Sequence, residues 1–561
     1  MRANEQDRQF FELDQRYHLN QDNQKLMRLE NPFAAILRSI ILLSMTSTAW
    51  AQFDPKGPEP LPAIQGTLFL HGGGAVSPEM RRIFTQLAGG KEARIVVVPT
   101  ADASDPLDPR KIDVWQQTEP KSVEFLHAES RDDVDRSNLD ELLANATGVW
   151  FSGGKQSTLV KVYANTQVEE GILRVLARGG IVGGTSAGMA IASKVMLVNN
   201  DFQTGFDLLS GCLVDQHFLV RNRTDRLRRA VAAHPDLVGF GIDEKTALIV
   251  RGRNLDVVGE SDVVVMLAAS GQRPERTDIL KPGMRADLIA LRRAAQARQS
   301  APFPAKQVIA PTVPNGSLLI AGGGPLPDEA LRQFVELAGG KDARIVYVPC
   351  EEAKTIELEP GMVRVLRSAG AGKVDWIHTK DRSLANDPVF TSKLIDATGI
   401  WFGGGRQWNF VDSYLNTETH RLMHLVLERG GVIGGSSAGA SIQGDYMPRG
   451  DPMGNTEMMA EGYERGMGFL TGVAIDQHFS QRNRFPDMRL LKKAFPQLLG
   501  IGIDEGTCVI VKKGQAEVIG PGQVAFFDRP EGSDSIQEHT SVVAGQAYDL
   551  ERRIRVDASI K

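Results

Sequence analysis

The sequence predicts an α/β protein made of two tandem copies of one domain, each a doubly wound, mainly parallel sheet with helices on both faces. Three observations predict this class. Short apolar, β-rich runs end in Gly or Pro, segments with helical apolar spacing lie between them, and the whole pattern occurs twice in the 561 residues. Alternation of strands and helices is typical of parallel sheets, whose functional residues gather on loops at the carboxyl ends of the strands.

In the first copy, strands and helices can be assigned in order. The predicted strands are 67–74, 93–100, 123–128, 148–154, 180–188 and 262–267. A helix is expected over 77–90, because Ser-Pro-Glu starts the segment, apolar residues follow at helical spacing and a Gly pair ends it. A second helix is expected over 168–180. Residues 286–314, rich in Ala, Arg and Pro, are expected to form a C-terminal helix and a linker.

Six phrases recur in the same order in the second half of the chain. Residues 87–99 and 337–349 are identical at 11 of 13 positions, and 215–223 and 476–484 at 7 of 9. The offset is 250 or 251 up to GGTSAG and GGSSAG and 261 afterwards, so the second copy has an insertion of about ten residues. The repeat length is that of a domain rather than a solenoid unit.

The repeats give a domain plan. We expect a first domain over 64–295, a linker over 296–314 and a second domain over 315–557. A duplicated domain can replace a homodimer by an intrachain pseudo-dimer, which would leave the chain monomeric.

Residues 1–51 precede the first repeat and are expected to be poorly structured. Within them, 27–51 has two arginines, a short apolar run and small residues ending in Ala-Trp-Ala, the pattern of a secretory signal peptide. The apolar run is too short to span a membrane. We expect translation from Met27 and a mature chain from about Gln52, secreted or periplasmic, with no stable membrane association after signal removal. An amphipathic N-terminal helix or a single membrane anchor is the alternative.

Composition excludes several classes of function. A net charge of -5 over this length is mild and gives no reason to expect nucleic acid or an anionic membrane as partner. The three cysteines, Cys212, Cys350 and Cys508, are widely spaced and form no CxxC or Cys/His cluster, so they are expected to be small buried hydrophobes. No metal and no cofactor is expected.

Each copy contains one G-x-S-x-G phrase, centred on Ser186 and on Ser437. A sharp strand-to-helix turn holds such a serine in a strained conformation, and small neighbours let the chain segments approach closely. Each phrase follows an apolar strand and precedes an Ala-rich helical start, which is the required context. The two serines are therefore candidate nucleophiles; a tight turn without catalytic function is the alternative.

A serine hydroxyl needs a base and an acid that orients the base. His217 and His478 align between the copies in the same D-Q-H-F phrase, and Glu244 and Glu505 each follow their histidine by 27 residues. Four aspartates compete for the role of the acid: Asp243 and Asp504 beside the glutamates, and Asp215 and Asp476 beside the histidines. The chain order Ser, His, Glu differs from that of α/β-hydrolases.

Other candidates surround these residues. An oxyanion hole needs backbone N–H groups, which the residue after each serine and the glycine pair after the Trp-Phe strand can supply; these are Ala187 with Gly153-Gly154, and Ala438 with Gly404-Gly405. Two glutamines, Gln156 and Gln407, follow the glycine pairs. The arginines beside the bases suggest recognition of a carboxylate; they are Arg221, Arg223 and Arg226 in the first copy and Arg482 and Arg484 in the second.

At G-T/S-S-A-G, D-Q-H-F-x-x-R-x-R and G-I-D-E the sequence resembles the cyanophycinase and dipeptidase E family, serine peptidases on the fold of class I glutamine amidotransferases. The resemblance covers each repeat from about Gly66 and Gly316 onwards. It implies Ser-His-Glu triads and assigns a peptide or cyanophycin-like polymer as substrate. Cyanophycinases cut the β-aspartyl-arginine polymer cyanophycin into dipeptides, and the wider family hydrolyses bonds next to aspartate. The implied substrate pocket comprises Gln156, Asp215, Arg221, Arg223 and Arg226, with Gln407, Asp476, Arg482 and Arg484.

Each copy departs from the family pattern. The first lacks the inserted residues, whereas the second has Asp487 where Arg226 aligns, and Lys155 or Arg406 stands where the family usually has an acidic residue. We therefore expect an exported serine peptidase for aspartyl, in particular β-aspartyl, peptides. The alternative is a silent or half-active tandem protein that binds peptides. A glutamine amidotransferase would need Cys in place of both serines.

Overall fold

The computed structural model describes residues 61–136, 139–271, 273–528 and 539–557. The predicted signal peptide at 27–51, with the rest of 1–51, lies outside the described residues and stays a prediction. No helix in the described ranges combines the length and the apolar character that a membrane crossing needs.

The first copy is built on a sheet of strand order β14-β11-β10-β1-β5-β4-β2-β3. Its strands are β1 Ile64–His71, β2 Arg94–Val98, β3 Ser122–Phe125, β4 Gly148–Phe151, β5 Ile181–Thr185, β10 Thr246–Gly252, β11 Asn254–Gly259 and β14 Arg285–Asp287. The run from β1 to β3 is parallel, and β10, β11 and β14 extend it in antiparallel pairing. The α/β fold class is confirmed, and the sheet is mixed where the antiparallel strands join it.

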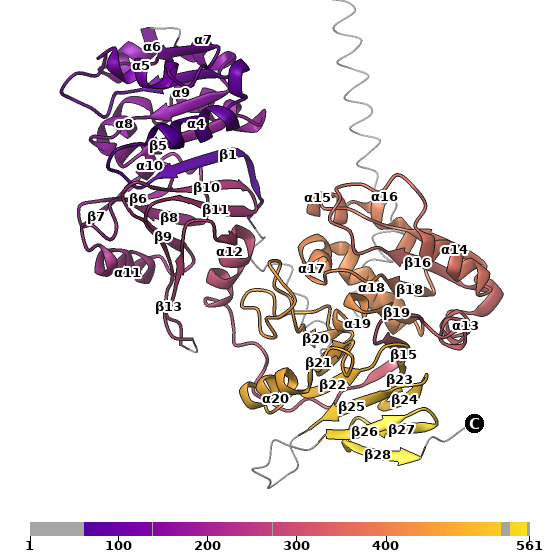
Figure 1. Ribbon diagram of the computed structural model, residues 1–561. Coiled ribbons are helices and arrows are strands. Elements are labelled where there is room, and N and C mark those ends of the chain that lie inside the picture. Colours follow the sequence, from indigo (N-terminus) through magenta and orange to yellow (C-terminus); the bar gives the residue numbers. More distant parts are fainter. Residues whose placement is uncertain (1–60, 137–138, 272, 529–538, 558–561) are drawn as a thin grey trace, which may run out of the picture. The chain divides into compact units, whose positions relative to one another are not determined.

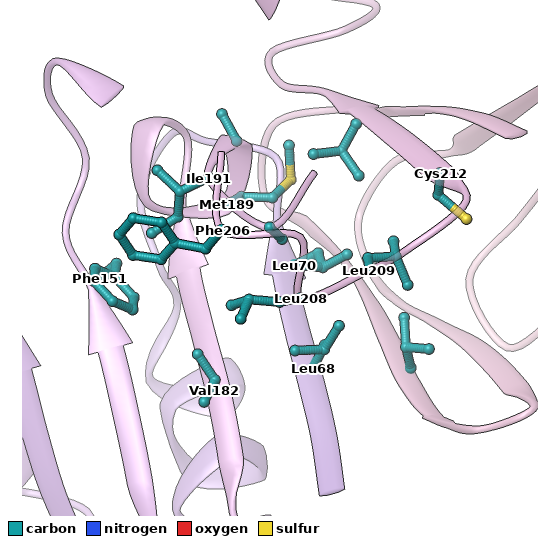
Figure 2. Packing of buried hydrophobic residues seen from close by; sticks show 14 of the residues in the cluster. Leu68, Leu70, Phe151, Val182, Met189, Ile191, Phe206, Leu208, Leu209 and Cys212 are labelled. Carbon is teal, nitrogen blue, oxygen red and sulfur yellow. The ribbon is translucent and has the colours of Figure 1, made fainter. Parts of the chain in front are cut away.

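Helices cover both faces of this sheet (Figure 1). Successive residues of a strand point to opposite faces. Phe69 of β1 accordingly packs on Phe84 of α4, whereas Leu68 and Leu70 lie in a second core with Ile172 of α9. Figure 2 shows part of this second core. The helices are α4 Pro78–Leu87, α5 Arg110–Gln116, α6 Arg131–Arg136, α7 Leu139–Ala144, α8 Gln156–Tyr163, α9 Gln167–Ala177, α10 Ala187–Ala190, α11 Thr224–Ala233 and α12 Leu288–Ala297, with a 3₁₀ turn at Gly90–Glu92.

A smaller sheet of order β13-β12-β9-β8 lies beyond the nucleophile turn in sequence. Its strands are β8 Cys212–Asp215, β9 Val238–Ile242, β12 Val263–Leu267 and β13 Arg276–Leu280, and a separate hairpin joins β6 Val195–Val198 to β7 Asp201–Thr204. Both β8 and β9 are fully buried and pair in parallel, so their carboxyl ends lie side by side. The predicted base and the predicted acid follow these two ends.

The second copy repeats the plan. Its larger sheet has the order β17-β16-β18-β19-β15-β23-β24-β27-β28, with strands β15 Val313–Ala321, β16 Arg344–Val348, β17 Lys373–Trp376, β18 Gly399–Phe402, β19 Val432–Ser436, β23 Cys508–Lys513, β24 Gln515–Ile519, β27 Gln546–Asp549 and β28 Ile554–Asp557. The smaller sheet holds β20 Gly444–Tyr446, β21 Leu470–Gln477, β22 Leu499–Ile503, β25 Gln523–Phe527 and β26 His539–Val543.

The helices of the second copy also follow the first. They are α13 Asp328–Leu337, α14 Gly361–Ser368, α15 Arg382–Ala385, α16 Pro388–Thr391, α17 Trp408–Tyr414, α18 Glu418–Glu428, α19 Ala438–Ser441 and α20 Phe485–Ala494, with 3₁₀ turns at Gly340–Asp342 and Ser392–Leu394. The copies differ between the serine and the histidine. There the first copy has the β6–β7 hairpin, and the second has β20 followed by a long loop over 447–469.

The connection between the copies is shorter than the predicted linker of 296–314. Helix α12 begins at Leu288, where the Asp287 side chain accepts the N–H of Ala290, and it continues to Ala297. Strand β15 already begins at Val313, which pairs with Lys513 across an irregularity in the register. Residues 298–312 are thus the part without helix or strand.

Two of the three cysteines are buried, as predicted. Cys212 and Cys508 are buried, Cys350 is partly buried, and all three are free thiols. Burial raises the pKa of Cys350 and of Cys508 to about 12, so both remain protonated and unreactive at neutral pH.

Candidate active sites

Each candidate serine stands at a strained turn between a strand and a short helix. Ser186 lies between β5 and α10 with φ 52° and ψ −109°, and Ser437 lies between β19 and α19 with φ 57° and ψ −114°. Left-handed backbone is costly for a residue with a side chain and persists where the surroundings enforce it. A Cβ on Gly184 would lie 2.5 Å from the carbonyl carbon of Gly188, which explains the glycines of the phrase.

The structure brings the predicted serine, histidine and glutamate of each copy into one hydrogen-bonded chain. Ser186 Oγ lies 2.7 Å from His217 Nε2, and His217 Nδ1 lies 2.6 Å from Glu244 Oε1. In the second copy the Oγ–Nε2 distance is 2.9 Å and the Nδ1–Oε1 distance 2.5 Å; this chain comprises Ser437, His478 and Glu505. The imidazole is therefore placed to accept a proton from the serine while the carboxylate holds its other nitrogen.

The glycine loop after the first strand of each copy fixes the imidazole, a function that the sequence analysis did not assign. The backbone N–H of His217 donates to the carbonyl of Gly72 at 2.7 Å, and a Cβ added to Gly73 would lie 2.3 Å from the imidazole Cε1. Gly322 and Gly323 make the same contacts with His478. The three consecutive glycines occur in both copies, and this repetition is the sequence signal that could have identified the role of the loop.

The competing aspartates have other partners. Asp243 Oδ1 accepts the N–H groups of Leu219 and Val220 at 3.0 Å each, and its Oδ2 accepts the Ser261 hydroxyl at 2.7 Å. Asp504 likewise accepts backbone N–H groups. These carboxylates bind the backbone of the turn that follows each histidine. The adjacent glutamate is therefore the carboxylate that forms the hydrogen bond with the imidazole.

Asp215 and Asp476 are completely buried and bind arginines. Arg223 donates to Asp215 at 3.2 Å and to the carbonyl of Gln216 at 2.7 Å, and Arg226 forms a bidentate pair with Asp215. In the second copy, Arg484 occupies the place of Arg223. These predicted substrate-pocket residues thus come together mainly as a buried ion-pair cluster beside the base. Arg221 and Arg482 are exposed.

The predicted glutamines hold the loop or hairpin that follows the nucleophile. Gln156 Nε2 donates to the carbonyl of Leu197 at 2.7 Å. Gln407 is buried, and its Nε2 donates to the carbonyls of Pro448 and Arg449 at 2.7 and 2.9 Å. In both copies the amide nitrogen of the glutamine therefore donates to backbone carbonyls of the protein itself.

The first glycine of each predicted oxyanion pair lies against the serine. A Cβ on Gly404 would lie 3.4 Å from Ser437 Cβ, and one on Gly153 would lie 3.7 Å from Ser186 Cβ. A Cβ on Gly154 would instead meet the carbonyl oxygen of Ala101 at 2.0 Å, and one on Gly405 would meet Cys350. The assignment of Gly154 and Gly405, with Ala187 and Ala438, to an oxyanion hole stays a prediction.

One buried histidine distinguishes the first site. His71 Nδ1 lies 2.8 Å from the Thr185 hydroxyl, directly before the nucleophile, whereas Ala321 occupies the same place in the second copy. Burial, and next the charge of His217, lower the pKa of His71 to about 4. The His71 ring is therefore neutral at physiological pH.

The two histidines on the serines are also kept neutral. Burial lowers the pKa of His217, the hydrogen bond to Glu244 partly opposes this, and the charge of Arg221 lowers it further. The same causes lower the pKa of His478, with Glu505 and Arg482 in the corresponding places. A neutral imidazole is the form that can accept a proton.

Comparisons with known proteins agree with the repeated architecture. The model of peptidase family S51 matches residues 68–258 and again 318–519. The chain is 36% identical over 203 residues to the cyanophycinase of Nostoc sp. (strain PCC 7120 / SAG 25.82 / UTEX 2576), covering 34% of this chain and 68% of that protein. It is 32% identical over 219 residues to the cyanophycinase of Synechococcus elongatus, covering 36% and 68%. The crystal structure of a peptidase from an acI-B1 Actinobacterium is 26% identical, with a TM-score of 0.32 and coverage of 40% and 98%.

Proposed function

The chain belongs to peptidase family S51 and is a serine peptidase, and from this we propose that it hydrolyses aspartyl peptides, in particular β-aspartyl peptides of the cyanophycin type, through two Ser-His-Glu triads. The observation that carries the proposal is the hydrogen-bonded chain from Ser186 through His217 to Glu244, with distances of 2.7 and 2.6 Å, and its repetition in the second copy.

The geometry supports acyl transfer in two steps. In the first site, His217 Nε2 accepts the Ser186 proton as Oγ attacks the carbonyl carbon of the substrate. The tetrahedral intermediate then breaks its C–N bond, and the leaving amine takes the proton from the imidazole. Water, deprotonated by the same nitrogen, next attacks the acyl ester; the C–O bond to Ser186 breaks, Oγ takes the proton back from the imidazole, and the acid is released. The Glu244 side chain, which lies on Nδ1, stabilises the imidazolium that forms in each step.

The charges beside the base favour an anionic substrate. Arg221 and Arg482 are exposed and lie close enough to influence the pKa of the two catalytic histidines. A guanidinium recognises a carboxylate through a planar pair of hydrogen bonds. A β-linked aspartyl residue carries a free α-carboxylate next to the scissile bond, and we assign its recognition to these two arginines.

The proposal is tested by the products formed from three substrates. The full chain is incubated with cyanophycin, with β-aspartyl-arginine and with α-aspartyl-arginine, and the products are separated and identified by mass spectrometry. We expect release of dipeptide from the polymer or of free aspartate from the β-linked dipeptide. Alanyl-arginine is the control and should remain intact. Intact substrates in all three reactions would contradict the proposal.

Replacing Arg221 by alanine is expected to move the acid limb of the first site's kcat/KM profile to higher pH. The Arg221 charge disfavours the imidazolium, so its loss raises the pKa of His217, and the base becomes protonated at a higher pH. The profile is measured in a chain that also carries Ser437→Ala. Arg229→Ala, at an exposed position of α11, is the control and should leave the profile in place. An acid limb that moves to lower pH would refute this role of Arg221.

A further inference from the structure

The buried carboxylate beside each base is neutralised differently in the two copies. In the first, both arginines on Asp215 come from the segment after the histidine, and Arg226 belongs to helix α11. In the second, Asp487 stands at the aligned position of α20, and the second arginine on Asp476 is Arg449. The arginine has thus moved from the helix to the loop over 447–469, which is longer than the β6–β7 hairpin at the same place in the first copy.

Arg449 fits this position closely. Its Nε lies 3.2 Å from both carboxylate oxygens of Asp476, and its Nη2 lies 2.6 Å from Asp487 Oδ2. Its Nη1 donates to the carbonyl of Asn455 at 3.0 Å, and its side chain is only 4% exposed. The aspartate at the helix position therefore serves as a further acceptor for the relocated guanidinium.

The loop backbone is shaped to present this residue. Arg449 has φ 58°, a left-handed conformation that costs energy for a residue with a side chain. Its N–H donates to the carbonyl of Met458 at 3.1 Å, and its own carbonyl accepts from Gln407. Arg406 donates to the carbonyls of Asp451 and Gly454 further along the loop. The two residues directly before α17 thus support the loop on the side of the active site.

The other end of the same loop is held by the first copy and by Arg298, the first residue of the connection between the copies. Glu461 pairs with Arg298 at 2.7 Å and with Arg273 at 3.1 Å, and Arg273 also pairs with Glu464 at 2.8 Å. These carboxylates are largely buried, with side-chain exposures of 13% and 9%. The hydroxyl of Tyr463, also buried, lies 3.0 Å from Arg253 of the first copy. Removing one partner of a buried pair is strongly destabilising, because the other charge remains desolvated.

We propose that Arg449 is a positioning residue of the second active site, replacing Arg226, and that the first copy holds the loop that carries it. The second site is then complete only in the tandem chain. This inference rests on the proposed function of the second triad. It also gives the duplication a use besides a second set of catalytic residues, since one copy serves as a structural support for the other's pocket.

The support by the first copy is tested with Glu461→Gln and Glu464→Gln combined, in a Ser186→Ala chain so that all turnover comes from Ser437. Glutamine keeps the side-chain shape and removes the charge. We expect KM for the aspartyl substrate to rise about 10-fold or more, the factor that a change of 1.4 kcal/mol produces, with kcat less affected. Faster hydrogen exchange over 447–467 should accompany the change. Glu418→Gln, which breaks an ion pair within the second copy, is the matched control.

The role of Arg449 is tested by moving the arginine back to the helix position. Arg449→Asn should raise KM at the second site, and the added substitution Asp487→Arg, which restores the arrangement of the first copy, should lower it again. A merely structural role of the loop would not produce this rescue. An unchanged KM in the Arg449→Asn variant would overturn the inference. So would an unchanged KM together with unchanged hydrogen exchange over 447–467 in the combined Glu461→Gln and Glu464→Gln variant.

Failure of the proposed function can be distinguished from failure of the inference about the loop. If the wild-type chain hydrolyses none of the substrates, the proposed function is wrong. Hydrogen exchange of the loop, which needs no turnover, then still decides whether the first copy holds it.

Discussion

Replacing Ser186 and Ser437 together by alanine is expected to lower kcat by about 10⁶-fold, the loss measured when a serine nucleophile is removed from a triad. Without Oγ no acyl ester forms, and the remaining groups can only bind substrate and polarise its carbonyl. Turnover is measured on the best substrate of the wild-type chain. Ser441→Ala is the matched control: this buried hydroxyl lies one turn after Ser437 and has no hydrogen-bond partner among the described residues.

The single variants apportion the activity between the copies. If both sites work independently, each single substitution leaves the turnover of the other site. A single variant with wild-type activity identifies a silent copy, and the chain is then half-active. Full activity in the double variant would falsify the serine mechanism. The sites have equivalent triads but different surroundings, with His71 beside the first and Arg449 beside the second, so unequal contributions are expected.

Glu244→Gln and Glu505→Gln are each expected to lower kcat of their own site by about 10⁴-fold, the cost of removing the carboxylate charge in a serine protease triad. Each carboxylate holds the Nδ1–H tautomer, which leaves Nε2 free to accept the serine proton. A glutamine amide can donate to Nδ1 instead, which places the proton on Nε2. Each variant is assayed in a chain whose other serine is alanine.

The neighbouring aspartate provides the control for this experiment. Asp243→Asn alters a side chain that binds the backbone N–H groups of Leu219 and Val220. We expect it to lower the free energy of unfolding by about 1–3 kcal/mol while changing kcat far less than Glu244→Gln does. Thermal unfolding and turnover are measured on the same preparations. If Asp243→Asn lowered kcat more than Glu244→Gln does, Asp243 and not Glu244 would be the acid that orients His217.

Much of the fold could be predicted because local signals and repetition agree. The strands before Ser186 and Ser437, the helices between strands and the turn phrases each have a clear pattern, and the second copy checks the first. The antiparallel extension through β10 and β11 was missed, because pairing direction depends on which strands meet. The linker bounds differed because Val313 pairs with a strand some two hundred residues later in the chain.

By itself, the sequence determined the duplication, the nucleophile turns and the pairing of each serine with one histidine, since collinear phrases of fixed residue types carry them. Only the tertiary structure decided which acid meets the imidazole. Asp243 and Glu244 are adjacent in sequence, but the backbone sends one side chain to the turn and the other to His217. The tertiary structure also showed that Arg449 pairs with Asp476. A guanidinium can reach a buried carboxylate from any nearby segment, and folding determines which segments are near.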